Sequence, residues 1–107
     1  MTLEGYHGPD YVLLSYDVSS ARRSAAVEVC RIIFGRRRSA RRDGSRAREE
    51  AGFIHRPGVV WVGQSVLFLP PRDALELEPR LRILGARVSS VHVPVSLARL
   101  QVFRRPR

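Results

Sequence analysis

The segment 11–18, YVLLSYDV, restricts the fold more than any other part of the chain. As far as Tyr16 its residues are almost all apolar, β-branched or aromatic, with no regular alternation between polar and apolar positions. Such a run is typical of a strand that is buried on both faces. We therefore expect a central strand here. The chain has 107 residues, which is enough for one compact domain and too few for two ordinary ones.

The sequence after this strand predicts a helix that ends near Phe34. Ser19 or Ser20 is suited to cap its start, and Gly35 is suited to end it. Apolar residues recur at helical spacing, namely Ala26, Val29, Cys30, Ile33 and Phe34. Cys30 is the only cysteine, so an intrachain disulfide is excluded, and its apolar setting predicts a buried thiol.

The second half of the chain alternates extended and helical patterns. Two extended runs cover 53–63 and 64–69, with a tight turn or bulge expected at Gly63 and Gln64. Residues 72–84 have helical propensity, although Pro79 predicts either a broken helix or a late start near Glu78. The run 86–95 reads as a last strand, and the C-terminal extension 96–107 either adds to the domain or docks on a neighbouring subunit.

The order of these elements predicts an α+β fold, a ferredoxin-like βαββαβ sandwich spanning residues 11–95 after a leader over 1–10. In such a fold four antiparallel strands carry both helices on one face. Because the helices protect only that side, we expect the open face and the unpaired edges of the sheet to be covered by a homodimer.

The charge balance indicates a polyanionic partner. All nineteen basic residues are arginine, lysine is absent, and the formal net charge is +9. Codon bias in a GC-rich genome explains the missing lysine, but it does not explain the excess of positive charge. Nucleic acid is therefore the expected partner. No apolar run approaches a membrane span and the N-terminus has no signal-peptide pattern, so we expect a cytoplasmic protein.

The basic charge is densest in residues 36–48, the main part of a predicted basic loop over 36–50. This stretch lacks the apolar side chains needed to offset its ordering entropy, so it predicts a mobile loop. Guanidinium groups bind phosphate in a bidentate manner, and such contacts position a protein without reading sequence. A solvated linker is the alternative. The seven arginines expected to contact nucleic acid are Arg36, Arg37, Arg38, Arg41, Arg42, Arg46 and Arg48.

The stretch YDVSSARR, residues 16–23, resembles the end of the first strand and the start of the first helix in the small core CRISPR-associated protein family, the structural subunit of the spacer-integration complex. QSVLFLP at 64–70 is similar to a later strand of that family. The resemblance implies an antiviral defence protein that forms a dimer with a C-terminal strand crossing to the partner and that holds duplex DNA between copies of an integrase subunit. Beside the arginine-rich loop, we expect Arg22 and Arg23 to serve as fixed nucleic-acid contacts near the dimer axis.

Several members of that family are metal-dependent nucleases that use the aspartate at the end of the first strand, which here is Asp17. The resemblance thus implies a catalytic, metal-binding role for Asp17 with magnesium as cofactor. Phosphodiester cleavage generally needs several carboxylates around the metal, so two Asp17 residues from a dimer would have to share the ion. The alternative is a turn carboxylate that bonds the backbone two residues on. The three histidines lie in separate elements and do not form a helical metal pair.

Three functions therefore remain open from the sequence. The first is a DNA-binding homodimer of the CRISPR adaptation type, contributing structure to spacer acquisition. The second is a magnesium-dependent endonuclease centred on paired Asp17 residues. The third is a basic RNA-binding accessory protein of a ribonucleoprotein.

Overall fold

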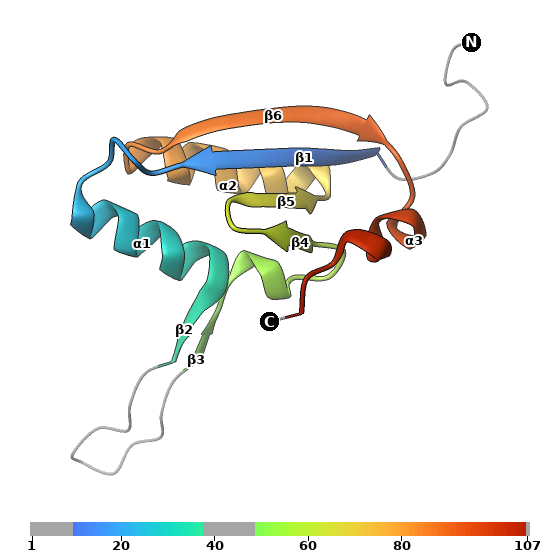
Figure 1. The fold of residues 1–107 in the computed structure, drawn as a ribbon, viewed down its shortest axis with the longest axis horizontal. Helices are drawn as coiled ribbons and strands as arrows, with labels where there is room; N and C mark the ends of the chain where they lie inside the picture. Colours follow the sequence, from blue (N-terminus) through green and yellow to red (C-terminus); the bar gives the residue numbers. More distant parts are fainter. Residues whose placement is uncertain (1–9, 38–48, 107) are drawn as a thin grey trace.

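The computed structural model describes residues 10–37 and 49–106. Its main sheet contains β1 (Asp10–Asp17), β4 (Val60–Gly63), β5 (Val66–Leu69) and β6 (Arg87–Pro94), in the order β4-β5-β1-β6 and with every neighbouring pair antiparallel (Figure 1). The strand expected at 11–18 is thus an inner strand of this sheet. The combination of an antiparallel sheet with helices agrees with the predicted α+β class.

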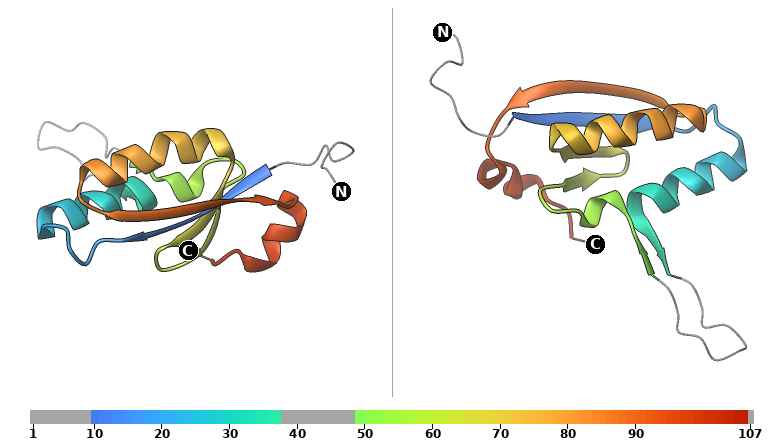
Figure 2. Two further views of the ribbon diagram at one scale, coloured as in Figure 1. Left: turned by 90° about the horizontal axis from the view of Figure 1, so that it is seen from above. Right: turned by 180° about the vertical axis from the view of Figure 1, so that it is seen from behind.

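Two helices cover one face of this sheet (Figure 2). They are α1 (Arg23–Phe34) and α2 (Pro71–Ile83). Alternate residues of β1 point toward them, because Leu14 is fully buried whereas Ser15 is exposed. The same cluster joins both helices to the sheet, and its members include Val12, Leu14, Val29, Ile33, Leu67, Leu69, Leu77, Leu81 and Val88.

The opposite face of the sheet is covered only in part. The C-terminal extension forms α3 (Leu97–Leu100) and η2 (Gln101–Phe103), and Leu100 completes a small second core with Tyr11 and Val60. The Phe103 ring packs against Phe68, with ring centroids 6.3 Å apart. Elsewhere on this face Val91 stays 55% exposed. The described part of the extension therefore folds back on its own sheet, and its predicted crossing to a partner stays a prediction.

The structure corrects the expected start of α1. The residue at the N-cap is Arg22, whose side chain makes no capping hydrogen bond, rather than Ser19 or Ser20. Ser19 is already engaged, because its backbone N–H and hydroxyl both donate to Asp17. The predicted end of the helix is confirmed, since Gly35 follows it with a φ of 89°.

The expected strand over 53–63 is interrupted. Phe53–His55 forms a 3₁₀ turn, η1, and β4 begins only at Val60. The reason is the sequence Arg56-Pro57-Gly58-Val59, in which Pro57 has no N–H to donate and Gly58 adopts a φ of 82°. The predicted irregularity at Gly63 and Gln64 is confirmed by the register shift there and by the positive φ of Gln64.

Pro79 does not break α2, contrary to the sequence prediction. The helix runs continuously from Pro71, at its favoured N1 position, to Ile83. Pro79 lies on the exposed side of the helix, where water can solvate the carbonyl that loses its partner. The buried stripe formed by Ala74, Leu77 and Leu81 is unaffected, and this packing holds the helix together.

The prediction for Cys30 was wrong, because its side chain is exposed. The buried stripe of α1 is Val29, Ile32 and Ile33, so the helix is rotated from the predicted stripe toward Ile32. Both stripes have helical spacing, and the position of η1 beside the helix decides between them: Ile32 and Ile33 share the main core with Phe53. Within residues 10–37 and 49–106, no helix has the length and apolar character needed to cross a membrane.

Candidate nucleic-acid interface

The two ends of the arginine-rich segment are paired with each other. β2 (Gly35–Arg37) directly continues α1 and runs antiparallel to β3 (Glu49–Ala51), forming a second, two-stranded sheet. This hairpin extends away from the main sheet (Figure 1). Arg36 is exposed, and Arg37 lies in the same strand. The remaining predicted contacts lie outside the described residues, namely Arg38, Arg41, Arg42, Arg46 and Arg48.

The base of the hairpin is fixed by close packing at Gly52. A side chain at this position would overlap backbone atoms of Ile33, Phe34 and Gly35. The next residue, Phe53, is 3% exposed and belongs to the main core. The chain therefore enters and leaves the hairpin from rigid structure at the end of α1, and this structure sets where the arginine-rich segment starts and ends.

Arg22 and Arg23 lie at the opposite end of α1. Both side chains are exposed, and the first turn of the helix contains no acidic residue. Within the described part of the chain, neither arginine forms an ion pair. Two cations next to the positive end of a helix dipole are unfavourable without an anion nearby. They are separated from the hairpin by the 12 residues of α1, a distance of about 18 Å.

Asp17 has the geometry of a turn carboxylate. It is exposed at the end of β1, its Oδ1 accepts the Ser19 N–H at 2.9 Å, and its Oδ2 accepts the Ser19 hydroxyl at 3.1 Å. These hydrogen bonds, with a smaller contribution from the nearby Arg87, lower the pKa of Asp17 below its usual value. The carboxylate is thus ionised, and each of its oxygens already accepts a hydrogen bond from Ser19, as expected for a residue that bonds the backbone two positions on.

No three carboxylate, histidine or cysteine side chains are grouped so as to hold a metal ion within residues 10–37 and 49–106. His55 and His92 are exposed and belong to separate elements, and His92 lies 2.9 Å from Asp10. Among the described residues, Asp17 therefore has no pair of further ligand side chains beside it that could share a magnesium ion. The paired-Asp17 site therefore stays a prediction.

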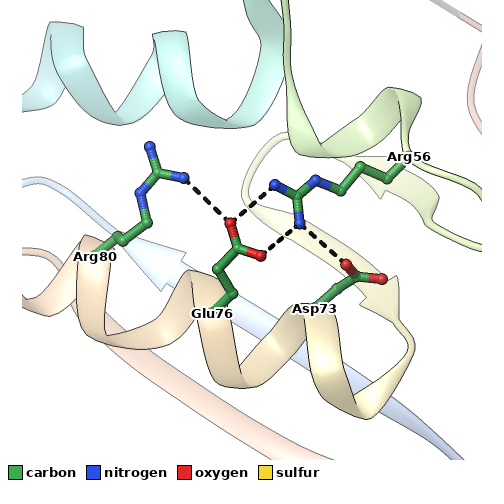
Figure 3. A network of polar contacts seen from close by, with 4 residues as sticks. All are labelled: Arg56, Asp73, Glu76 and Arg80. Carbon is green, nitrogen blue, oxygen red and sulfur yellow. Dashed lines mark hydrogen bonds and ion pairs between the residues drawn. The ribbon is translucent and has the colours of Figure 1, made fainter.

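A charged cluster that sequence reasoning missed joins η1 to α2 (Figure 3). The guanidinium of Arg56 donates to both carboxylate oxygens of Glu76, at 2.8 and 2.9 Å, and to Asp73 at 3.1 Å. It also lies 3.8 Å from the centre of the Phe53 ring, whereas Arg80 lies 5.5 Å from that ring. The hydrogen bonds that Arg56 donates to Glu76 are the main cause that raises the pKa of Arg56 further above its usual range.

The sequence predicts only the α2 part of this cluster. Asp73, Glu76 and Arg80 recur at three- and four-residue spacing, so a helix places them on one side. Nothing in the sequence shows that Arg56, from a loop 17 residues before Asp73, lies against that side.

The chain matches no family model, and no curated protein or solved structure is detectably similar to it. The resemblance to the CRISPR adaptation family thus depends on the short motifs quoted above.

Proposed function

We propose that this chain binds nucleic acid through the phosphate backbone, with segment 36–48 as the principal contact. The observation that carries the proposal is the presence of seven arginines within thirteen residues, which begin in β2 and continue through the segment that joins β2 to β3. Pairing of β2 with β3 keeps the two ends of the segment together, and these two strands extend away from the main sheet. Guanidinium groups presented in this way bind phosphates and release counterions.

Arg22 and Arg23 extend the proposed surface along α1. They add two exposed cations at a helix end that already favours anions. Because α1 is rigid, its two ends define a fixed spacing between these arginines and the base of the hairpin. Two separated contacts of this kind favour an extended polyphosphate, such as a duplex, over a small anion.

The proposed fold type is ferredoxin-like, and the proposed assembly is a homodimer. The strand order, the antiparallel pairing and the common face of α1 and α2 support the fold type. The partly open sheet face supports the homodimer, since Leu13 and Val91 line a shallow apolar hollow there. A role as the structural subunit in CRISPR spacer acquisition, with duplex DNA and an integrase subunit as partners, depends on the motifs at 16–23 and 64–70.

The central test is the salt dependence of DNA binding. Fluorescence anisotropy of a labelled duplex, measured over a series of NaCl concentrations, should give a steep fall in affinity with salt, because the slope grows by about 0.9 for each phosphate neutralised. A variant in which glutamine replaces all seven arginines of segment 36–48 should lose most of that slope. Competition with a structured RNA separates a DNA-binding protein from an RNA-binding accessory protein.

A charge-matched comparison makes this test specific. A second variant replaces seven arginines outside the proposed surface with glutamine: Arg72, Arg82, Arg87, Arg99, Arg104, Arg105 and Arg107. This variant has the same net charge as the first. Equal losses of affinity in the two variants would mean that general basicity, rather than segment 36–48, explains binding, and negligible binding by the wild type at low salt would refute the proposal.

Cleavage by paired Asp17 residues is the second candidate. The observation in its favour is that Asp17 is exposed and ionised at the end of a rigid strand. Highly purified wild type and Asp17→Ala proteins should be incubated with duplex DNA and magnesium. Cleavage by the wild type that Asp17→Ala abolishes supports an endonuclease, whereas equal activity or inactivity of both proteins contradicts it.

A further inference from the structure

Three arginines from three different elements surround one hollow beside the base of the hairpin. Arg31 comes from α1, Arg56 follows η1, and Arg80 comes from α2. The hollow has a volume of about 100 Å³ and is also lined by Glu28, Ile32, Ala51 and Phe53. Its lining therefore combines three cations and one anion over an apolar base, and Ala51 belongs to β3 of the hairpin.

Arg56 is the fixed wall of this hollow. Its hydrogen bonds to Asp73 and Glu76 lie on the side facing α2 (Figure 3). The Phe53 ring lies against the guanidinium. A bidentate contact restrains the orientation of an arginine as well as its position. The hollow therefore has one guanidinium of fixed orientation, whose charge is balanced by Asp73 and Glu76.

Arg31 and Arg80 have donors to spare. Arg31 makes one hydrogen bond, to Glu28 at 3.2 Å, within an exposed pair. The nearest carboxylate to Arg80 is Glu76, at 3.7 Å, which is an ion pair without a hydrogen bond. In the part of the chain that the structure describes, the Arg80 guanidinium donates no hydrogen bond. An incoming anion therefore displaces only weak, solvent-screened contacts.

We propose that this hollow binds a phosphate group, with Arg31 and Arg80 as the hydrogen-bond donors beside the fixed guanidinium of Arg56. The inference rests on the proposed function, because the phosphate it places here belongs to the nucleic-acid backbone held by the adjacent hairpin. The volume of the hollow suits one phosphate group, and the arginine donors from α1 and α2 approach it from two sides, as the oxygens of a phosphate require. The bound backbone would then contact both segment 36–48 and the packed part of the domain.

The experiment compares two double variants with equal loss of charge. Arg31→Gln/Arg80→Gln removes the donors, and Arg72→Gln/Arg99→Gln removes two exposed arginines outside the hollow. Duplex DNA binding is measured by anisotropy against salt. The first variant should bind at least about tenfold more weakly than the second, with a salt slope smaller by roughly 1 for each lost phosphate contact. Circular dichroism and the unfolding midpoint check that both variants are folded.

Titration with inorganic phosphate, followed by NMR of the arginine Nε–H signals, distinguishes the source of the phosphate. Shifts of the Arg31 and Arg80 signals with inorganic phosphate alone, absent in Arg31→Gln/Arg80→Gln, would support a phosphate site even if the wild type failed to bind DNA. If the wild type binds DNA and the two double variants bind equally, this inference is wrong while the proposed function stands. If the two double variants bind DNA equally and inorganic phosphate shifts neither the Arg31 nor the Arg80 signal, the hollow is not a phosphate site.

Discussion

Gly52 sets the path of the chain into the hairpin, and its replacement by alanine tests that packing directly. Its backbone angles are ordinary for any residue, with φ −83° and ψ 170°. A glycine is needed there for space: an added Cβ would overlap the backbone N of Gly35, the carbonyl O of Ile33 and the carbonyl C of Phe34. These three atoms belong to the end of α1, so relief requires movement of the backbone.

The expected cost follows from two opposing effects. Overpacking a rigid site costs about 1–3 kcal/mol, and backbone neighbours place Gly52→Ala near the upper end. The unfolded chain loses entropy when alanine replaces glycine, which stabilises the fold by about 0.4–1 kcal/mol. The net result is a loss of about 2 kcal/mol in the free energy of unfolding. For a domain near 100 residues this corresponds to a fall of roughly 8–16 °C in Tm.

Urea unfolding followed by circular dichroism measures this loss, and Gly85 supplies the control. Gly85 has a φ of 91° but open space for a Cβ, with Ala21 3.8 Å away. At position 85 asparagine should cost less than alanine, because asparagine tolerates positive φ. At position 52 asparagine should cost at least as much as alanine, because only volume matters. A Gly52→Ala protein as stable as the wild type would refute the close packing of the hairpin base against α1.

Three further outcomes follow from the described residues. The folded state lowers the pKa values of Asp17 and Glu76, so both carboxylates stabilise the fold fully above their unfolded-state pKa values. This stabilisation is lost as the pH falls through the folded-state pKa values. Urea midpoints measured between pH 7 and pH 2 should therefore fall less in an Asp17→Asn/Glu76→Gln protein than in the wild type. Burial raises the pKa of Tyr16 to about 12, so stability should decline as the pH rises from about 10 toward 12, and Tyr16→Phe should weaken that decline in urea midpoints measured across this range. The exposed thiol of Cys30 should react with a disulfide reagent in the native protein about as fast as in urea; strong native protection would support the buried position that the sequence suggested.

The elements with a strong local pattern were predictable from the sequence. The central strand at 11–18, the end of the first helix at Gly35 and the last strand each agree with the structure to within a residue or two. Each has either a continuous apolar run or a clear terminating residue, so its limits depend on local chemistry. Local chemistry also explains the turn role of Asp17, since a carboxylate followed two residues later by an exposed serine completes its own hydrogen bonds.

The errors occur where distant segments decide between local alternatives. The rotation of α1 that exposes Cys30 depends on Phe53, which packs beside Ile32 and Ile33 from twenty residues further along the chain. The pairing of β2 with β3 could not be read from a segment whose arginines predict a loop. The contact of Arg56 with Glu76 likewise needs the path of the chain through η1. Sequence periodicity contains no information about which face a neighbour will cover.

Among the described residues, most ion pairs of arginine involve the carboxylates of α2. On α2, Glu76 and Glu78 pair with arginines of the same helix, and Asp73 and Glu76 also hold Arg56. At the start of α1 no acidic residue accompanies Arg22 or Arg23. The charge of the described residues is therefore neutralised along one helix and left unbalanced at the end of the other. Uncompensated cations repel each other and lower stability, and a bound polyanion would remove that repulsion, as the proposed function requires.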